Sequence, residues 1–258
     1  MLQLSGAAHV ASHHLEHTMP MTPARLHRMR VLAEQEAAAS AAIDPHGPMQ
    51  GSEHQLMLAT LHAHKSTLKN IKAVDNKIAA KVKLLPDFDP YIDGVLQADA
   101  GAQDPVLVEV LVWQIDVGNW PRVLELADYA LRHQLKMPDQ YNRDLPAVVM
   151  EETAEAAIAG KLAGHDALVT LAKVDQLTTG LDIHDQVRAK LHKAIGWAAM
   201  GKTTTTEVDP KQLELQPVQI ALEHLTRAVT LFDKVGVKKD VERLERRLTE
   251  LQQSDAPT

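Results

Sequence analysis

Cysteine is absent from this sequence, aromatic residues are scarce and long apolar runs are missing. Without cysteine the chain has neither disulfide bonds nor thiolate metal sites. Aromatic residues make up 3% of the chain and hydrophobic residues 45%, which is typical of alanine- and leucine-rich helices packed on one another. No apolar run reaches the roughly 20 residues that span a bilayer, and no export signal opens the chain. We therefore expect an all-α protein of the cytoplasm, without membrane contact.

The charge of the chain is negative overall but unevenly distributed. The formal net charge is -7. Residues 1–83 carry nine Lys and Arg against six Asp and Glu, whereas residues 84–258 carry 18 against 28. This asymmetry predicts a basic arm on an acidic body. It excludes a protein that coats nucleic acid over its whole surface, because such a protein is basic throughout.

The first segment of the chain combines a histidine-rich lead-in with a basic helix. We expect residues 1–20, with four histidines, to be unstructured. Thr22 and Pro23 can cap a helix, and the breaker residues of 43–52 predict a linker after it. The candidate phosphate contacts on this helix are Arg25, Arg28 and Arg30.

The longest helical pattern is predicted from Ser52 to about Leu85. Its apolar residues repeat at alternating four- and three-residue steps, as in a coiled coil, with two polar interruptions. The seam residues assigned to oligomerisation are Leu61, Leu68, Ile71, Ile78 and Val82. The lysines off this seam are Lys65, Lys69, Lys72, Lys77, Lys81 and Lys83. Two interpretations stay open: the stripe packs on the chain's own core, or the helix self-associates and offers its lysines to phosphates.

A helical hairpin at 104–135 organises the remainder. Asp104 and Pro105 form a helix start, Gly118 ends that helix and Trp120 opens the next. Further helices are predicted at 146–163, 166–177, 184–200, 217–234 and 237–252. Their small residues suggest stacked antiparallel helix pairs, loosely like tetratricopeptide repeats, although the loop 201–216 is too long for a regular array.

Three clusters invite a chemical interpretation, and each has a simpler one. Glu151 and Glu155 share a helix face that a two-metal nuclease could use, but carboxylates near a helix start are ordinary. The three aspartates Asp87, Asp89 and Asp93 lack the glycine and the distal glutamate of a calcium loop, and we assign Asp89 to a helix cap. The segment 201–203, Gly-Lys-Thr, lacks the leading glycine and the preceding strand of a phosphate-binding loop. We predict no catalytic residue, no metal and no cofactor.

Six segments of the chain carry a resemblance to a known family: TPARLHRMRVLAEQ near residue 22, LLPDFDPYIDGVL at 84–96, GAQDPVLVEVLVWQIDVGNWPRVLELADYAL at 101–131, LKMPDQYNRDLP at 135–146, VRAKLHKAIGW at 187–197 and GVKKDVERLERRL at 236–248. They resemble the small terminase subunits of peduovirus-type tailed double-stranded-DNA phages. The resemblance covers roughly residues 22–250 and is most specific at 84–146.

The resemblance implies a DNA-packaging role inside the host cytoplasm. Such subunits bind the cohesive-end packaging site of viral double-stranded DNA, form homo-oligomers and recruit the large terminase subunit, which is the ATPase. We expect a lead-in at 1–20, a DNA-binding and oligomerisation region at 21–85, a helical-hairpin body at 86–252 and a tail at 253–258. The family is often labelled the endonuclease subunit, but the residues give that label little support. The alternatives are a helical-repeat adaptor that binds protein only and a metal-dependent nuclease.

Overall fold

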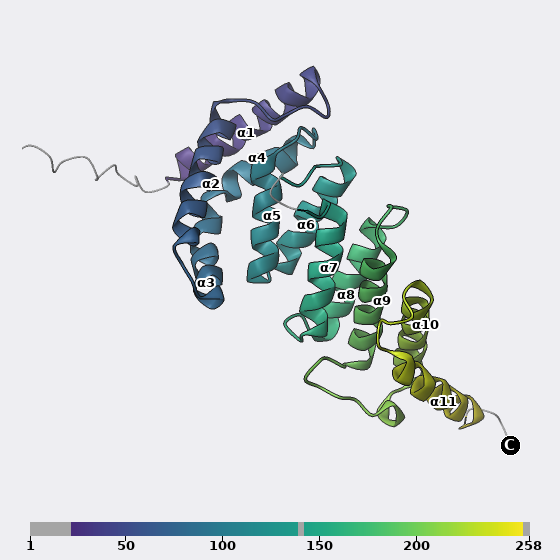
Figure 1. The fold of residues 1–258 in the computed structure, drawn as a ribbon. Coiled ribbons are helices and arrows are strands. Elements are labelled where there is room, and N and C mark those ends of the chain that lie inside the picture. Colours follow the sequence, from purple (N-terminus) through teal and green to yellow (C-terminus); the bar gives the residue numbers. More distant parts are fainter. Residues whose placement is uncertain (1–21, 139–141, 255–258) are drawn as a thin grey trace, which may run out of the picture.

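The computed structural model describes residues 22–138 and 142–254, and these residues form eleven α-helices and no β-strand. The prediction of an all-α fold is confirmed. The helices follow one another along an elongated body, with α1 to α3 at one end and α11 at the other (Figure 1). They are α1 (Pro23–Ile43), α2 (Ser52–Lys69), α3 (Val74–Leu84), α4 (Asp89–Ala98), α5 (Pro105–Val117), α6 (Trp120–Arg132), α7 (Leu145–Ile158), α8 (Gly164–Leu177), α9 (Asp185–Met200), α10 (Leu215–Leu231) and α11 (Lys238–Ser254). The predicted lead-in 1–20 and most of the tail 253–258 lie outside the described residues.

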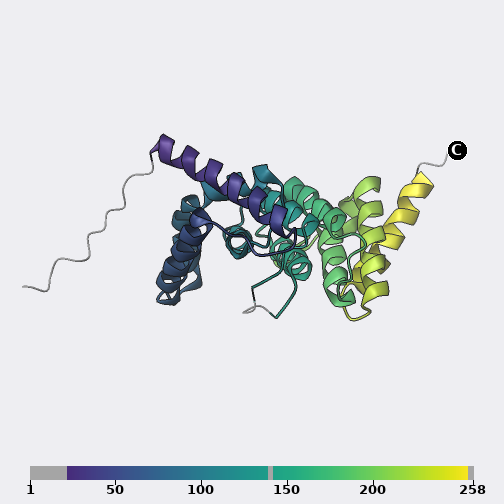
Figure 2. The same ribbon diagram turned by 90° about the horizontal axis from the view of Figure 1, so that it is seen from above.

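The first helix and the linker after it follow the sequence prediction. The Thr22 hydroxyl accepts a hydrogen bond from the Arg25 amide at 3.3 Å, which caps α1. The linker 44–51 is held against the body, because Met49 donates its amide to the Gln103 carbonyl at 2.9 Å and Gln103 donates its own to Gly47 at 2.8 Å. Figure 2 shows α1 lying along the top of the neighbouring helices.

The prediction of one continuous helix from Ser52 to Leu85 is wrong. The chain leaves the helix after Lys69 and starts α3 at Val74. Asn70 contributes to this break, since its side-chain amide donates to the Ser66 carbonyl at 3.3 Å and so competes with the helical backbone pattern. The heptad pattern therefore covers two separate helices, α2 and α3, and not one continuous helix.

Two short elements lead from α3 into the central hairpin. A 3₁₀ turn, Leu85–Asp87, precedes α4. Asp89 is the first residue of α4, and its side chain makes no capping hydrogen bond, so the prediction that it caps the helix is wrong. Three apolar or aromatic residues of this segment anchor it in the core, because Phe88, Tyr91 and Ile92 are fully buried.

The central hairpin forms as the sequence predicts. The Asp104 carboxylate accepts the amides of Val106 and Leu107 at 2.9 and 3.3 Å, which caps α5. Gly118 ends α5 with a φ of 74°, in the left-handed region that favours glycine. Helix α5 is buried on nearly all sides. It belongs to one continuous hydrophobic core that runs from α1 to α9.

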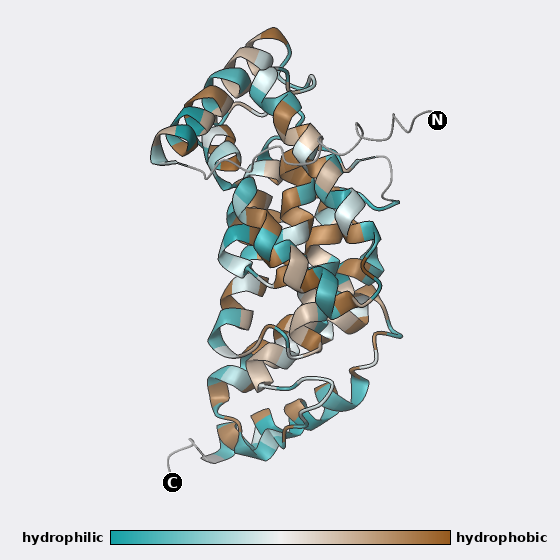
Figure 3. Cartoon of the chain, turned by 90° about the vertical axis from the view of Figure 1, so that its left-hand side faces the viewer, coloured by the Kyte–Doolittle hydropathy of each residue, from teal (hydrophilic) through white to brown (hydrophobic). Residues whose placement is uncertain are grey.

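The C-terminal helices extend this core and then add a smaller one. Helix α9 packs against α7 on one side and α10 on the other, and α10 packs against α11. The approach of α9 to α10 is close, since a Cβ added at Gly196 would lie 2.6 Å from the Leu225 side chain. A second hydrophobic cluster joins the end of α9 to α10 and α11. Figure 3 shows that hydrophobic residues concentrate in the middle of the body, whereas the helix at the C-terminus carries more hydrophilic residues.

Candidate nucleic-acid interface

The arginines predicted on α1 lie on its exposed side. Arg25, Arg28 and Arg30 are all solvent-exposed, within two turns of the helix start. The Arg30 guanidinium lies 3.3 Å from the His27 ring nitrogen Nδ1. Met29, between them, is buried in the core and fixes the face that the arginines present. This end of α1 therefore offers three guanidinium groups to solvent.

The predicted lysines divide into two groups. Lys65 and Lys81 are held by carboxylates of α5: the Lys65 ammonium lies 3.0 Å from Glu109, and Lys81 pairs with Asp116. Lys81 also lies 5.6 Å from the centroid of the Trp113 ring. Their positive charges are thus partly neutralised inside the chain, and they fasten α2 and α3 to the body.

The second group of lysines stays available to a ligand. We call it the hairpin surface, and it consists of Lys69, Lys72, Lys77 and Lys83, at the turn between α2 and α3 and along α3. Lys69, Lys72 and Lys83 are exposed and Lys77 is half-buried. In the described part of the chain none of the four has a carboxylate within ion-pair distance. The predicted contacts are therefore brought together only in part.

The residues predicted for oligomerisation divide in the same way. Leu61 and Leu68 are buried in the chain's own core, and Ile71 packs against it. Helix α3 has no buried residue. Along it, Val74 is 69% and Val82 55% exposed, and Ile78 lies one turn from each. These three residues form an apolar stripe on α3 that the chain itself leaves largely uncovered.

Helix α2 is positioned by a carboxylate that the sequence did not reveal. Glu36, on α1, accepts the amides of Glu53 and His54 at 3.0 Å each, and so caps α2 from a neighbouring helix. Gly51 makes this approach possible, because a Cβ at that position would lie 2.0 Å from the Glu36 carboxyl carbon. Burial and the nearby Glu36 raise the pKa of Glu53.

A buried polar network ties α2 to α4 and α5. The Tyr91 hydroxyl donates to the Asp104 carboxylate at 2.8 Å and lies 2.8 Å from the His54 Nδ1. Burial raises the pKa of Asp104, whereas the neighbouring His54 and the hydrogen bonds to its carboxylate oppose that shift. Burial also raises the pKa of Tyr91 well above its usual value. The network is buried, so it fixes the start of α2 against α4 and α5 and does not contact a ligand.

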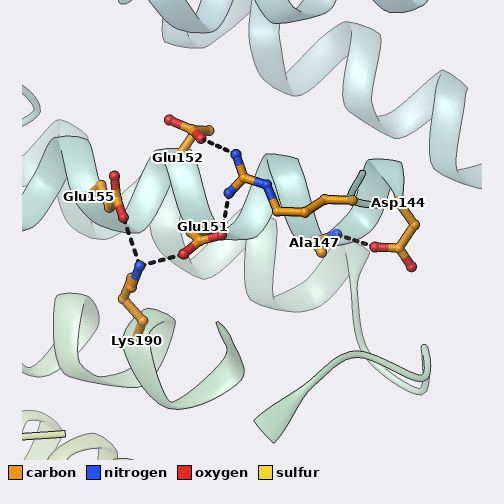
Figure 4. Close-up of polar contacts among 7 residues, drawn as sticks. Asp144, Ala147, Glu151, Glu152, Glu155 and Lys190 are labelled. Carbon is orange, nitrogen blue, oxygen red and sulfur yellow. Dashed lines mark hydrogen bonds and ion pairs between the residues drawn. The ribbon is translucent and has the colours of Figure 1, made fainter. Parts of the chain in front are cut away.

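The candidate nuclease carboxylates on α7 are neutralised by two cations. Figure 4 shows Glu151 between Lys190 and an arginine side chain. Glu151 forms ion pairs with Lys190 and Arg143, Glu155 pairs with Lys190 at 2.7 Å, and Glu152 pairs with Arg143 at 3.0 Å. The Lys190 ammonium, followed by the Arg143 guanidinium, lowers the pKa of Glu151 against the effect of burial. These carboxylates hold α9 and the connection before α7 together.

The aspartates after α3 point to different partners. Asp87 accepts from the His64 Nε2 at 2.9 Å, and Asp93 accepts from Arg122 at 2.6 Å. Burial raises the pKa of Asp89. Among the described residues, no group of three or more His, Asp and Glu side chains is arranged to hold a metal ion. No helix there is both long and apolar enough to cross a membrane.

The comparisons with known proteins agree with the resemblance seen in the sequence. Residues 58–186 match the family of phage small terminase subunits. A "Terminase, endonuclease subunit" of Escherichia phage P2 is 38% identical over 228 residues, which are 88% of this chain and 85% of that protein. A "Probable terminase, endonuclease subunit" of Haemophilus phage HP1 is 27% identical over 180 residues, 67% of this chain and 62% of that protein. No solved structure matches the chain significantly. The chain thus belongs to the family of phage small terminase subunits, and its role is in phage DNA packaging.

Proposed function

We propose that this subunit binds the cohesive-end packaging site of the viral double-stranded DNA through α1 to α3. The observation that carries the proposal is the set of exposed cations at this end of the molecule. Three arginines on α1 and the four lysines of the hairpin surface have no carboxylate at ion-pair distance within the described residues. Cations of this kind bind DNA by displacing condensed counterions from its phosphates.

We propose further that copies of the chain assemble through α3. The stripe of Val74, Ile78 and Val82 supports this step, because two such stripes would remove one another from water. Lys77 and Lys83 of the hairpin surface lie on the same helix, so assembly would place several sets of lysines side by side. Weak phosphate contacts would then add up through avidity.

In this proposal the ATPase and the DNA cleavage belong to the large terminase subunit, which the assembled small subunits recruit. The pairing of Glu151 and Glu155 with Lys190 supports this division, because a metal ion would have to displace an ammonium group. The names of both relatives favour a second candidate, an endonuclease subunit. A third candidate is an adaptor that binds protein only.

The DNA-binding proposal is tested by neutralising the hairpin surface. The variant carries Lys69→Gln, Lys72→Gln and Lys83→Gln. Its matched control carries Lys136→Gln, Lys161→Gln and Arg227→Gln, three exposed cations elsewhere on the body. Duplex binding is measured as log K against log salt. We expect the magnitude of this slope to fall by about two to three for the hairpin variant and to stay unchanged for the control. An equal slope in both variants contradicts the proposal, and no DNA binding by the native chain favours the adaptor.

The endonuclease candidate is tested with the purified chain, packaging-site DNA and magnesium or manganese. We expect no cleavage until the large subunit is added. Cleavage by the chain alone that Glu151→Ala abolishes would establish the endonuclease instead. Self-assembly is tested separately by native mass measurement, in which Val82→Glu should reduce the assembly to monomers and Thr249→Glu, exposed on α11, should not.

A further inference from the structure

A second cationic surface lies at the opposite end of the molecule from the hairpin surface. The loop between α9 and α10, the turn before α11 and α11 itself enclose a groove of about 1250 Å³ that is open to solvent. We call it the C-terminal groove. Five of its cations are exposed and reach it from three segments: Lys211, Lys234, Lys239, Arg243 and Arg246.

Helix α11 contributes charges of both signs to the groove, and three of its cations form a row. Lys239, Arg243 and Arg246 follow one another at four- and three-residue steps and line the groove. Of the acidic residues on α11, Glu242 and Glu245 are exposed and lie outside the groove lining. Asp240 and Glu250 line the groove, where they pair with Lys202 and Arg247. At a rise of about 1.5 Å per residue, the three cations form a row roughly 10 Å long. The sequence pattern, a mixture of both signs, conceals this row because its charges nearly cancel along the chain.

The floor of the groove is held by a buried network. The Lys202 ammonium lies 2.9 Å from Asp240, and the Trp197 indole donates to the other oxygen of Asp240 at 3.0 Å. Lys202 and Asp240 are each 8% exposed at their side chains. Arg247 donates to the Leu213 carbonyl at 3.0 Å and so joins α11 to the loop. The walls are therefore fixed relative to one another before any ligand binds.

The three cations of the row form no ion pair within the described residues. Lys202 is neutralised by Asp240 and Glu207, and Lys238 lies 3.4 Å from Asp233. By contrast, within residues 22–138 and 142–254, no ion pair involves the five exposed cations of the groove. Arg246 donates its Nε to the Glu242 carbonyl, which leaves its two terminal amino groups for a ligand.

The groove lacks the features by which a protein partner or a base is gripped. Its aromatic side chain, Trp197, is buried, and two lysines cover the ring, with Lys193 at 4.4 Å and Lys202 at 4.9 Å from the centroid. Protein interfaces usually depend on aromatic or apolar anchors that fill pockets, and base recognition depends on stacking or on contacts to base edges. A row of point charges without such anchors instead matches a repeating polyanion.

We propose that the C-terminal groove binds the phosphodiester backbone of nucleic acid without reading its sequence. This inference rests on the proposed DNA binding and adds a second contact to it. The second contact lies in the part of the chain that is acidic overall. The two surfaces lie at opposite ends of the chain, so each can be removed while the other is kept (Figure 1).

The test uses the full chain with the variant Lys239→Gln, Arg243→Gln and Arg246→Gln. The control is again Lys136→Gln, Lys161→Gln and Arg227→Gln, which removes the same charge elsewhere. Duplex DNA of unrelated sequence is titrated over a range of salt concentrations, and a glutamate-rich peptide is titrated in parallel. Circular dichroism and thermal unfolding verify that both variants fold like the native chain.

We expect the magnitude of the slope of log K against log salt to fall by about two to three for the groove variant and to keep its native value for the control. A groove variant with the control's slope overturns the inference. So does a variant that keeps the DNA slope but no longer binds the peptide, because the groove then belongs to an acidic protein. If the groove variant loses slope while the hairpin variant does not, the groove inference holds and the proposal for the hairpin surface fails.

Discussion

The ammonium group of Lys65 on α2 lies 3.0 Å from the Oε2 atom of Glu109 on α5. The other oxygen of Glu109 accepts the Trp113 indole N–H at 3.2 Å. The Glu109 side chain is 5% exposed, so its charge is largely removed from water. One lysine of the predicted DNA-binding set therefore has a structural task, which is to join the basic N-terminal helices to the central hairpin.

This ion pair predicts a large effect of Lys65→Met, which keeps the aliphatic stem and removes the charge. We expect the free energy of unfolding to fall by about 2 kcal/mol, because the Glu109 carboxylate stays buried after its ammonium is lost. Urea unfolding of this variant, of Glu109→Gln and of the double variant gives the coupling energy. Lys69→Met, on the exposed face of α2, should change stability by less than about 0.5 kcal/mol. Equal effects at the two positions would refute the structural role of Lys65.

The sequence predicted local structure well and tertiary partners poorly. Helix starts at Thr22 and Asp104 and the helix end at Gly118 follow from contacts within a few residues, and all three are confirmed. The break after Lys69 was missed because the apolar spacing continues across it. The cap of α2 by Glu36 and the pairing of Lys65 depend on residues 17 and 44 positions away, and no local pattern indicates such contacts.

The contact between α1 and α4 depends on Gly94. A Cβ at this position would lie 2.2 Å from the Arg30 carbonyl oxygen and 2.9 Å from the Ala33 Cβ. Because backbone atoms cannot move aside as a side chain can, Gly94→Ala should destabilise the protein by about 2 kcal/mol, despite the better helix propensity of alanine. Hydrogen exchange should increase most in α1. Ala63→Gly, at an exposed position of α2, serves as a control that measures the difference in helix propensity alone. If Gly94→Ala stabilised the protein, the close contact would be disproved.

A pair of histidines predicts a loss of stability in acid. The Nδ1 atoms of His192 and His224 lie 2.9 Å apart between α9 and α10. Burial lowers the pKa of His192 to about 4 and also lowers that of His224. Below pH 6.5 the unfolded chain therefore binds protons that the folded chain rejects, and the free energy of unfolding falls until about pH 4. We expect a loss of about 2 kcal/mol over this range.

The experiment measures thermal unfolding at pH 7 and pH 4.5 for the native chain and for a double variant that carries both His192→Asn and His224→Asn. The double variant should lose less stability between the two values. His46→Asn, at an exposed histidine of the linker, should behave like the native chain. A double variant with the full native pH dependence would show that other groups cause the acid sensitivity.

One buried polar atom predicts a stabilising substitution. The Gln114 Oε1 atom on α5 has no hydrogen-bond partner among the described residues, and the side chain is buried. Gln114→Met preserves the shape and removes the cost of burying this acceptor, so stability should rise by about 1 kcal/mol. Gln55→Met, exposed on α2, serves as the control in the same denaturant series. A destabilised Gln114→Met would indicate that the amide has a role in the packing of α5.

The Glu36 carboxylate, bonded to the first amides of α2 and approached closely by Gly51, makes two helices into one cooperative unit. Helix α2 cannot keep its first turn once α1 has detached, since the group that satisfies those amides leaves with α1. The amide protons of Glu53 and His54 therefore exchange at a rate set by the opening of α1. The exchange rates of these two amides thus measure how often α1, the helix that carries Arg25, Arg28 and Arg30, detaches from the body.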